Sequence, residues 1–518
     1  MPHSPASGPP PAAAPRQAPL NDRLLRSWLR CRRRAWLDRH GPPQERLWSA
    51  HRALALHDQV LSFETLVPRR PGRGEAACAA GAAGVVGLRL RGSGPAGLAV
   101  EAHPSLLERI EGSSRWGSHR YRPVLARQGR RTTREHRLVL ALWGRLLAEH
   151  QAAPVPQGLV VAGRGRALER QRLSLGGGLQ RQLDTSLQRL AEDLRRREPP
   201  PLVNDRRKCT LCSWRGICDA EAAAAGHLGE VSGIGGKRRE LLLDLGITDL
   251  HGLAAADPAQ LAAELGAHGE QHAEAAPRLV AQARVQAEGR PRRLLEGPAL
   301  PELAAAPGVL VYDIESDPDS REDFLHGVLH LERRADGSWP PAAGGQGRYR
   351  PLLALQEHGE ARLWNRLRRL LEGRPDWPLL HYGETEALAL LRLAQRQGAP
   401  EAERQRLRRR MVDVHERLRR HWLLPANGYG LKPVATWLGF RWSQKGVDGA
   451  RCLLWWRQWR RRHDRQALAR IFRYNHDDAL ATWAVARWLL DQEAAPPPAP
   501  TGGSTKASGS DGSSSTPG

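Results

Sequence analysis

Two carboxylates in the stretch GVLVYDIESDPDS, Asp313 and Glu315, are of the right type and spacing for metal chemistry. The short apolar run before them, bounded by glycine, predicts a buried strand. Residues two apart on a strand point to the same side, so both carboxylates share one face. Two buried carboxylates repel each other unless a cation joins them. The spacing therefore favours a Mg²⁺ or Mn²⁺ site, and the alternative is a solvated strand end.

Further candidate side chains follow in later segments. Glu386 lies on a helix after the strand-like start of PLLHYGETEALALLRLA, and Tyr474 and Asp478 lie four apart in RIFRYNHDDALATWAVARWLL. That spacing places both on one face of an amphipathic helix. Asp477 is an alternative to its neighbour Asp478, and Asp413 is expected to be structural. No Ser or Cys nucleophile with a paired His is evident, so we expect no covalent intermediate.

These residues resemble the DEDD group of RNase H-like exonucleases, related to DnaQ-type proofreading domains. The closer likeness is to the YprB-type domain that follows RecB-like nucleases in predicted bacterial and cyanobacterial proteins. The resemblance implies an RNase H-like mixed sheet flanked by helices over residues 305–494. It also implies 3′→5′ hydrolysis with two divalent metal ions. Five residues of this chain match the pattern: Asp313, Glu315, Glu386 (where many members have Asp), Asp478, and Tyr474, which would position the attacking water.

Four cysteines form a second constellation, spread over residues 20–225. Cys31 comes early, and KCTLCSWRGIC supplies Cys209, Cys212 and Cys218. A Cys-x2-Cys pair brings two thiolates to one tight turn. The layout resembles the iron–sulfur members of the RecB-like family, which implies a [4Fe–4S] cluster joining the two ends of a PD-(D/E)XK-like domain. A four-cysteine zinc site also fits the spacing.

The chemistry of that family is not matched. The expected Pro-Asp is Pro104–Ser105, and the expected strand acids fall at Val124–Leu125, with Arg127 near the Lys position. Glu108 and Glu111 are off the pattern. We expect this domain to keep its fold and cysteine site, to have lost its nuclease chemistry, and to bind nucleic acid. The alternative is an intact active site that the alignment misses.

A helix–hairpin–helix is predicted within residues 226–292. The segment GEVSGIGGKRRELLLDLGITDL supplies Gly233, Gly235, Gly236 and Lys237. Glycines permit a tight turn whose N–H groups can receive a phosphate at the start of a helix. Such modules contact the nucleic-acid backbone without reading sequence, or pack as spacers between domains.

The composition of the whole chain limits its possible partners and location. Its 518 residues carry a formal net charge of +24, which favours DNA or RNA as a partner, although abundant arginine from GC-rich coding is an alternative cause. No apolar run is long enough to span a membrane, and the start lacks a signal peptide. Six cysteines without such a signal favour a reducing cytoplasm.

We therefore predict an α/β multidomain nuclease, with disordered segments at 1–19 and 495–518. Two other functions stay open: a non-catalytic iron–sulfur scaffold that binds nucleic acid, and a RecB-like endonuclease whose C-terminal acids are vestigial. The Trp- and Arg-rich segment 441–465 could stack on single-stranded bases or pack in a core, and packing is favoured.

Overall fold

The computed structural model describes residues 18–127, 129, 131–163, 167–317, 322–342 and 347–494. Its internal contacts divide the chain into two compact units, each considered by itself. Unit 1 is Met1–Glu288 with Gly446–Leu468, and unit 2 is Gly289–Lys445 with Ala469–Gly518. The segments predicted to be disordered lie outside the described residues, apart from Ala18 and Pro19.

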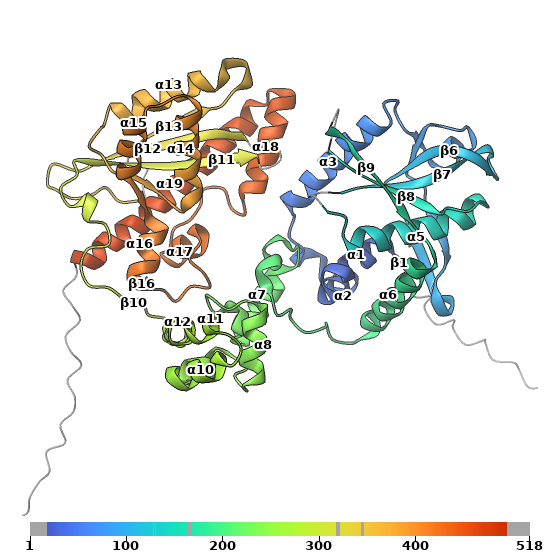
Figure 1. The fold of residues 1–518 in the computed structure, drawn as a ribbon, viewed down its shortest axis with the longest axis horizontal. Coiled ribbons are helices and arrows are strands. Elements are labelled where there is room, and N and C mark those ends of the chain that lie inside the picture. Colours follow the sequence, from blue (N-terminus) through green and yellow to red (C-terminus); the bar gives the residue numbers. More distant parts are fainter. Residues whose placement is uncertain are drawn as a thin grey trace, which may run out of the picture. The chain divides into compact units, whose positions relative to one another are not determined.

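Unit 1 is built on a six-stranded sheet of order β2-β3-β6-β7-β8-β9 (Figure 1). Its strands are β2 (Gly72–Arg73), β3 (Gly84–Val86), β6 (Leu106–Ser114), β7 (Gly117–Ala126), β8 (Gln157–Ala162) and β9 (Glu169–Ser174). β3, β6 and β7 pair antiparallel, and β7 pairs parallel with β8. The parallel pair is joined by the crossover helix α5 (Arg134–Gln151), as such connections require.

Helices cover both faces of this sheet. Neighbouring residues of β6 point to opposite sides: Leu107 packs with α1 (Asp22–Arg30), α5 and α6 (Gly177–Arg195), whereas Leu106 packs with the end of α3 (Ala50–Leu66). Asn21 begins α1 by accepting the N–H of Leu24 at 2.9 Å. Sequence period and capping therefore account for the α/β layering of this unit.

A separate small core is wholly helical. It is formed by α8 (Gly236–Asp244), α9 (Leu250–Ala255), α10 (Pro258–Gly266) and α12 (Ala276–Glu288), whose leucines and alanines pack together. This is the region in which the helix–hairpin–helix is predicted. Its contacts place it in unit 1, so three independent domains remain a prediction.

Unit 2 contains a five-stranded mixed sheet of order β13-β12-β11-β14-β15. The strands are β11 (Gly308–Asp317), β12 (Glu322–Glu332), β13 (Arg348–Leu353), β14 (Leu379–His381) and β15 (Met411–Asp413). β12 is antiparallel to β11 and β13, while β14 is parallel to β11 and β15. The central position of β11, between β12 and β14, explains why its residues are apolar on both faces.

The two faces of β11 have different covers. Val309 and Val311 pack with the long helix α19 (Arg465–Ala494), whereas Leu310 and Tyr312 pack with α13 (Gly359–Glu372) and α14 (Glu384–Arg396). Two shorter helices, α16 (Val414–His421) and α17 (Leu431–Trp437), lie between β15 and α18 (Gly449–Arg462) in the chain. Odd-numbered positions of β11 thus face α19, and so do Asp313 and Glu315.

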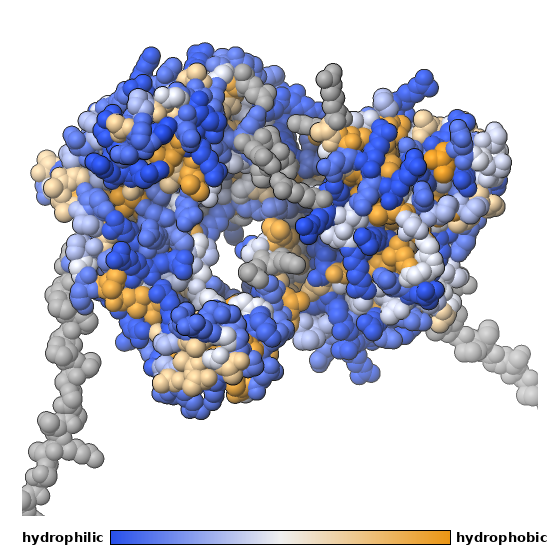
Figure 2. Space-filling view, in the orientation of Figure 1, coloured by the Kyte–Doolittle hydropathy of each residue, from blue (hydrophilic) through white to orange (hydrophobic). Residues whose placement is uncertain are grey.

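The molecular surface in Figure 2 is mostly hydrophilic, with hydrophobic residues scattered over it. None of the helices in the described ranges has the length and apolar content needed to cross a bilayer.

Candidate active site

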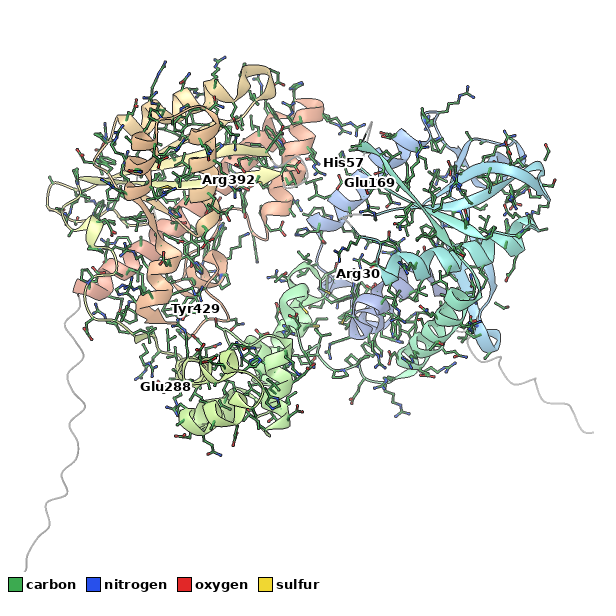
Figure 3. The ribbon with its side chains drawn as sticks, in the orientation of Figure 1. Arg30, His57, Glu169, Glu288, Arg392 and Tyr429 are labelled. Atoms are coloured by element: carbon green, nitrogen blue, oxygen red, sulfur yellow. The ribbon has the colours of Figure 1, made fainter. Side chains whose placement is uncertain are left out.

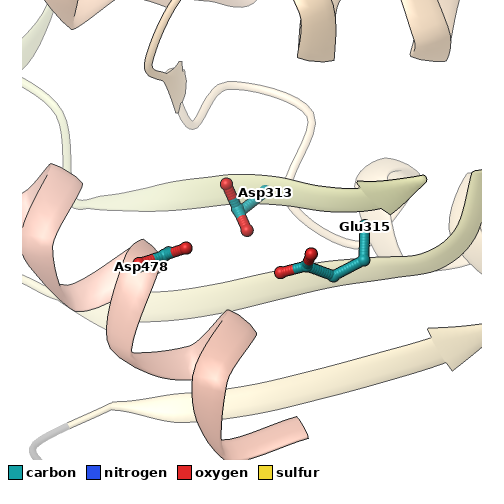
Figure 4. A group of neighbouring side chains, drawn as sticks. All are labelled: Asp313, Glu315 and Asp478. Carbon is teal, nitrogen blue, oxygen red and sulfur yellow. The ribbon is translucent and has the colours of Figure 1, made fainter. Parts of the chain in front are cut away.

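Three carboxyl groups from two elements meet on the α19 face of the unit 2 sheet. Asp313 and Glu315 come from β11, and Asp478 comes from α19. One oxygen from each lies within 4.8 Å of the others, and Figure 4 shows the groups turned toward one another. We call Asp313, Glu315 and Asp478 the carboxylate cluster. Carboxylate oxygens at this separation are suited to a hard divalent cation.

The electrostatics of the cluster reflect its crowding. Burial raises the pKa of Asp313 well above its ordinary value, and the negative charges of Asp478, Glu315 and Glu386 raise it further. The pKa of Asp478 is raised to about 6, again mainly by burial. Like charges in a low-dielectric site favour protonation unless a cation is present. A divalent cation would therefore compete with protons for these carboxylates.

Glu386 approaches the cluster from the first turn of α14. Its Oε2 atom is buried and has no hydrogen-bond partner among the described residues. Its pKa is raised to about 7, first by burial and then by the charges of Asp413 and Asp478. A buried carboxylate oxygen without a donor is costly, and a cation would satisfy it. Glu386 is thus a candidate fourth ligand, although it is not within the 4.8 Å group.

Asn475, which the sequence analysis did not select, fixes the orientation of Asp313. It is fully buried, and its Nδ2 donates to Asp313 Oδ2 at 2.6 Å. Its Oδ1 accepts the hydroxyl of Tyr349 at 2.8 Å. Gly327, directly opposite Asp313 in the sheet, leaves room for this amide, because a Cβ there would lie 1.8 Å from Asn475 Oδ1. Asn475 lies three residues before Asp478 on the same helix face, and this spacing is the feature of the sequence that could have identified it.

Tyr474, Lys432 and Trp442 flank the cluster beside Asp478. Tyr474 lies one turn before Asp478 and makes a side-chain hydrogen bond with it. Trp442 donates its Nε1 hydrogen to Asp478 Oδ1 at 2.6 Å. The Lys432 ammonium lies 5.0 Å from the centre of the Tyr474 ring, and its charge lowers the pKa of Asp478. Lys432 was missed because a single lysine on the short helix α17 has no motif in the sequence.

Two nearby aspartates have other partners. Asp477 Oδ2 accepts both the N–H of Ser443, at 2.9 Å, and its hydroxyl, at 2.6 Å. Asp413 begins α16 by accepting the N–H groups of His415 and Glu416, and it also accepts the N–H of Gly383. Asp478, rather than Asp477, is therefore the residue of this pair that joins the carboxylate cluster.

The four predicted cysteine ligands are near one another but not in close contact. Cys31 lies between α1 and α2 (Arg32–His40), and the Cys212 N–H donates to the Cys209 carbonyl at 2.9 Å. Burial, with smaller contributions from the other three cysteines, raises the pKa of Cys209 to about 11. Among the described residues, three ligand atoms within 4.8 Å of one another occur in the carboxylate cluster and not among the cysteines. The sulfurs are thus wider apart than a zinc ion with bonds of about 2.3 Å requires.

The strand positions that the RecB-like pattern reserves for acids are apolar. Ser105 immediately precedes β6, whose first residue Leu106 pairs with Val124 of β7, and Val124 is fully buried. Arg127 follows β7 and forms an ion pair with Glu169, which Figure 3 labels. Of the two acids that are off the pattern, Glu108 is paired with Arg122 at 2.8 Å. Unit 1 has no grouped carboxylates like those of unit 2 among the residues described.

The predicted hairpin glycines precede α8. Gly233 has a φ of +96°, which favours glycine, and Gly235 is the N-cap of the helix. A Cβ on Gly236 would lie 3.2 Å from the Cβ of Asp205, so the first turn of α8 contacts another part of unit 1. The Lys237 side chain is 72% exposed. The hairpin region is thus partly covered by unit 1 itself, while its lysine is free to reach solvent.

One comparison with known proteins concerns the C-terminal part of the chain. A family model of the RNase H superfamily matches residues 310–490. These residues include the carboxylate cluster, Glu386 and Tyr474. No curated protein matches the sequence. The match supports a C-terminal RNase H-like domain, and such a domain suggests a metal-dependent nuclease that uses a divalent ion and a nucleic-acid substrate.

Proposed function

We propose that the protein is a 3′→5′ exonuclease that hydrolyses phosphodiester bonds at the carboxylate cluster of unit 2. The observation that carries the proposal is the convergence of Asp313, Glu315 and Asp478 within 4.8 Å, inside the region matched by the RNase H superfamily. The polarity rests on the resemblance to DEDD exonucleases. The compartment we infer is the cytoplasm, in keeping with six cysteines that are all free.

The donor set fits divalent cations. Three clustered carboxylates and the unpartnered Oε2 of Glu386 are oxygen ligands of the kind that Mg²⁺ and Mn²⁺ prefer. Asp313, Glu315 and Asp478 would hold one ion, and Glu386 would complete the site for a second. When bound, two such ions supply Lewis acidity to the phosphate and stabilise the attacking and leaving oxygens.

The protein's own groups then orient the reactants. The Tyr474 hydroxyl, which is hydrogen-bonded to Asp478, would position the attacking water. Lys432, beside Tyr474, supplies a positive charge for a phosphate oxygen. Asn475 keeps Asp313 in one orientation, so that little reorganisation is needed during the reaction.

End-labelled oligonucleotides test the polarity and the sugar preference. The full chain is incubated with Mn²⁺ and single-stranded DNA or RNA carrying a label at the 5′ end. A ladder that shortens progressively from the 3′ end is expected, and the faster of the two substrates identifies the sugar. Immediate release of a labelled mononucleotide would instead show attack from the 5′ end. A few internal products would show an endonuclease.

For unit 1, we propose a PD-(D/E)XK-like domain without nuclease chemistry that binds nucleic acid. The helix-flanked sheet with a parallel β7–β8 crossover supports the fold, and buried Val124 in place of an acid supports the loss of activity. The helix–hairpin–helix at Gly233–Lys237 would add backbone contacts. Lys237→Glu is expected to weaken duplex binding, with Glu240→Lys as the control of opposite charge on the same helix; equal affinity for both would favour a spacer.

For the cysteines, we propose a [4Fe–4S] cluster, with zinc as the alternative. Four free thiols from both ends of the unit are a complete donor set for the cluster. Iron, sulfide and zinc are measured in protein purified without oxygen, together with the visible absorption. The cluster predicts iron and sulfide that Cys31→Ser removes, with Cys78→Ser as the control. Zinc in their place would overturn it.

A further inference from the structure

A hollow of about 270 Å³ lies beside the edge strand β13 of unit 2. Its walls include His358, Arg362 and Arg366 from the start of α13, Phe472 from α19, and the apolar side chains of Pro351 and Leu353 from β13. Positive charge and a partly buried aromatic ring therefore meet in one concave place. Neither the carboxylate cluster nor the matched family assigns this place a role.

The hollow is aligned with the carboxylate cluster by the register of the sheet. Pro351 pairs with Gly327, which pairs with Asp313, and Leu353 pairs with Leu325, which pairs with Glu315. Residues directly opposite on neighbouring strands share a face. The lining residues of β13 are thus in the same two rows, and on the same face, as the acids of β11. Two strand spacings separate them, or about 10 Å.

The helix α19 gives an independent measure of this separation. Phe472 precedes Asp478 by six residues on that helix, which corresponds to about 9 Å of rise. Both routes therefore place the hollow one or two nucleotides away from a phosphate held at the cluster. A strand bound at the cluster could reach the hollow at the edge of the sheet, where α13 from the opposite face meets β13 and Phe472 of α19.

The positive charge of the hollow is uncompensated. Arg362 and Arg366 lie four apart on α13, are exposed, and have no ion-pair or hydrogen-bond partner among the described residues. By contrast Arg368, on another face of the same helix, pairs with Glu372 and Glu403. The N-cap residue of α13, His358, makes no side-chain capping hydrogen bond, so this helix start is also open to an anion.

The inference that follows rests on the proposed function and deepens it. We propose that the hollow is a binding subsite for the single-stranded substrate next to the scissile bond. Arg362 and Arg366 hold a backbone phosphate, and the Phe472 ring stacks on an unpaired base. Stacking tolerates every base and requires that the base be unpaired. The subsite therefore selects single strands without reading their sequence.

Binding measured without cleavage tests the phosphate contact. The full chain, in the presence of EDTA, is titrated with a fluorescent single-stranded hexanucleotide at several salt concentrations. The double variant Arg362→Gln, Arg366→Gln is expected to bind about tenfold more weakly, and its salt dependence to fall by about 0.7 for each phosphate charge released. The matched control is Arg406→Gln, Arg409→Gln, two exposed arginines of α15 (Glu401–Arg410), beside β15 at the opposite edge of the sheet.

The outcomes distinguish a specific binding site from a general effect of net charge. The control is expected to keep the affinity and the salt dependence of the parent. Parent-like binding by the Arg362/Arg366 variant would overturn the subsite. An equal loss in the control would also overturn it, because the effect would then be general charge.

The stacking contact is tested with Phe472→Leu. Removing the ring is expected to weaken binding of the ordinary hexanucleotide by about fivefold or more. The same substitution should change nothing for a hexanucleotide whose bases are replaced by abasic sugars. Equal losses for both ligands would show that Phe472 acts only on the fold and would overturn the stacking role.

Cleavage assays separate this inference from the proposed function. If the parent cleaves while the Arg362/Arg366 variant has its full kcat/KM on long strands, the subsite fails and the nuclease stands. If the parent binds through the hollow yet cleaves nothing, the nuclease fails and the binding site stands. The expected result is a variant with a raised KM, and therefore a lower kcat/KM, on long strands.

Discussion

At the scale of single residues, the carboxylate cluster combines two opposing demands. Asp313, Glu315 and Asp478 are held within 4.8 Å, and Glu386 adds its charge from α14. Without a cation this proximity destabilises the folded state, because like charges repel in a site shielded from water. The cost is tolerable where function requires the charges to be together. A cation bound at these residues would therefore stabilise the folded state.

The first prediction concerns pH and metal. The pKa of Glu386 is raised to about 7 and that of Asp478 to about 6, so the folded state binds more protons than the unfolded state between about pH 4 and these values. The stability of the metal-free protein should thus fall as pH rises from about 4 to about 7. Mn²⁺ at a hundred times the Kd for about pH 8 should restore about 2.7 kcal/mol at that pH, and the same Mn²⁺ concentration should restore less at about pH 5. Thermal unfolding with and without Mn²⁺ measures this.

The matched variant removes the charges. Asp313→Asn combined with Glu386→Gln should unfold at a higher temperature than the metal-free parent and respond little to Mn²⁺. A parent whose Tm ignores Mn²⁺ at both pH values would show that these residues hold no metal.

A second residue-scale prediction uses Gly327. A Cβ at this position would meet Asn475 Oδ1 at 1.8 Å and force the amide away from Asp313. Gly327→Ala should destabilise the protein by about 1–3 kcal/mol and reduce cleavage further than this loss explains. The control is Gly428→Ala, where no atom lies within 4 Å of the added Cβ. Unfolding and cleavage are measured together, and full activity in Gly327→Ala would exclude a positioning role for Asn475.

Sequence reasoning reached part of this site. The i, i+2 period of a strand placed Asp313 and Glu315 on one face, and the i, i+4 period of a helix placed Tyr474 beside Asp478. These rules act within one element. The contact of Asn475 with Asp313 crosses 162 positions of sequence, and the space for it comes from a glycine on a third element. Such contacts depend on sheet register, which no local pattern fixes.

At the scale of elements, Asp413 links two helix starts. Its Oδ1 accepts the N–H groups of His415 and Glu416 at the start of α16, and the N–H of Gly383 before α14, which carries Glu386. One carboxylate thus holds α16 and the turn that positions a candidate ligand.

The third prediction follows from this link. Asp413→Ala should cost about 1–2 kcal/mol of stability through the lost cap and should also lower the cleavage rate, because Gly383 loses its partner. Asp448→Ala removes a comparable cap, at the start of α18, where Asp448 accepts the N–H of Arg451. We expect both variants to lose stability and only Asp413→Ala to lose activity. Equal activity in the two, measured at a temperature where both are folded, would contradict the link.

The helix α18 shows where element-level prediction stops. Packing was favoured over stacking for its tryptophans, and Trp455 and Trp456 are indeed buried. The sequence places α18 between two pieces of unit 2, yet its contacts are with α3 of unit 1. Arg457, for example, pairs with Asp58. An amphipathic pattern predicts that one face of a helix is buried, but it does not predict which part of the chain buries that face.

At the scale of the whole molecule, the fourth prediction concerns the packing of α18 with unit 1, although the sequence of α18 lies between two pieces of unit 2. A fragment of residues 289–494 would leave the apolar face of α18, with Cys452, Leu453 and Trp455, without its cover. Exposed apolar patches of this kind promote association. The fragment should therefore self-associate, and the same fragment with residues 446–468 replaced by a Gly/Ser linker should be monomeric. Light scattering after size exclusion compares the two, and a monomeric unmodified fragment would contradict the role given to α18.

The overall charge of +24 and the RNase H superfamily match both point to nucleic acid, but they do not by themselves establish catalysis. A scaffold with vestigial acids would have the same composition and the same fold. The two functions differ in whether cleavage requires the carboxylate cluster.

Single-turnover cleavage of a 5′-labelled strand in Mn²⁺ makes this distinction most directly. The parent is compared with Asp313→Asn, Asp478→Asn, and the control Asp491→Asn, which alters a surface ion pair with Arg487 on the same helix as Asp478. We predict that each cluster variant loses at least about a hundredfold in rate while still binding the strand, and that the control cleaves like the parent. Cleavage at the parent rate by Asp313→Asn and Asp478→Asn would contradict the assignment of the active site to unit 2.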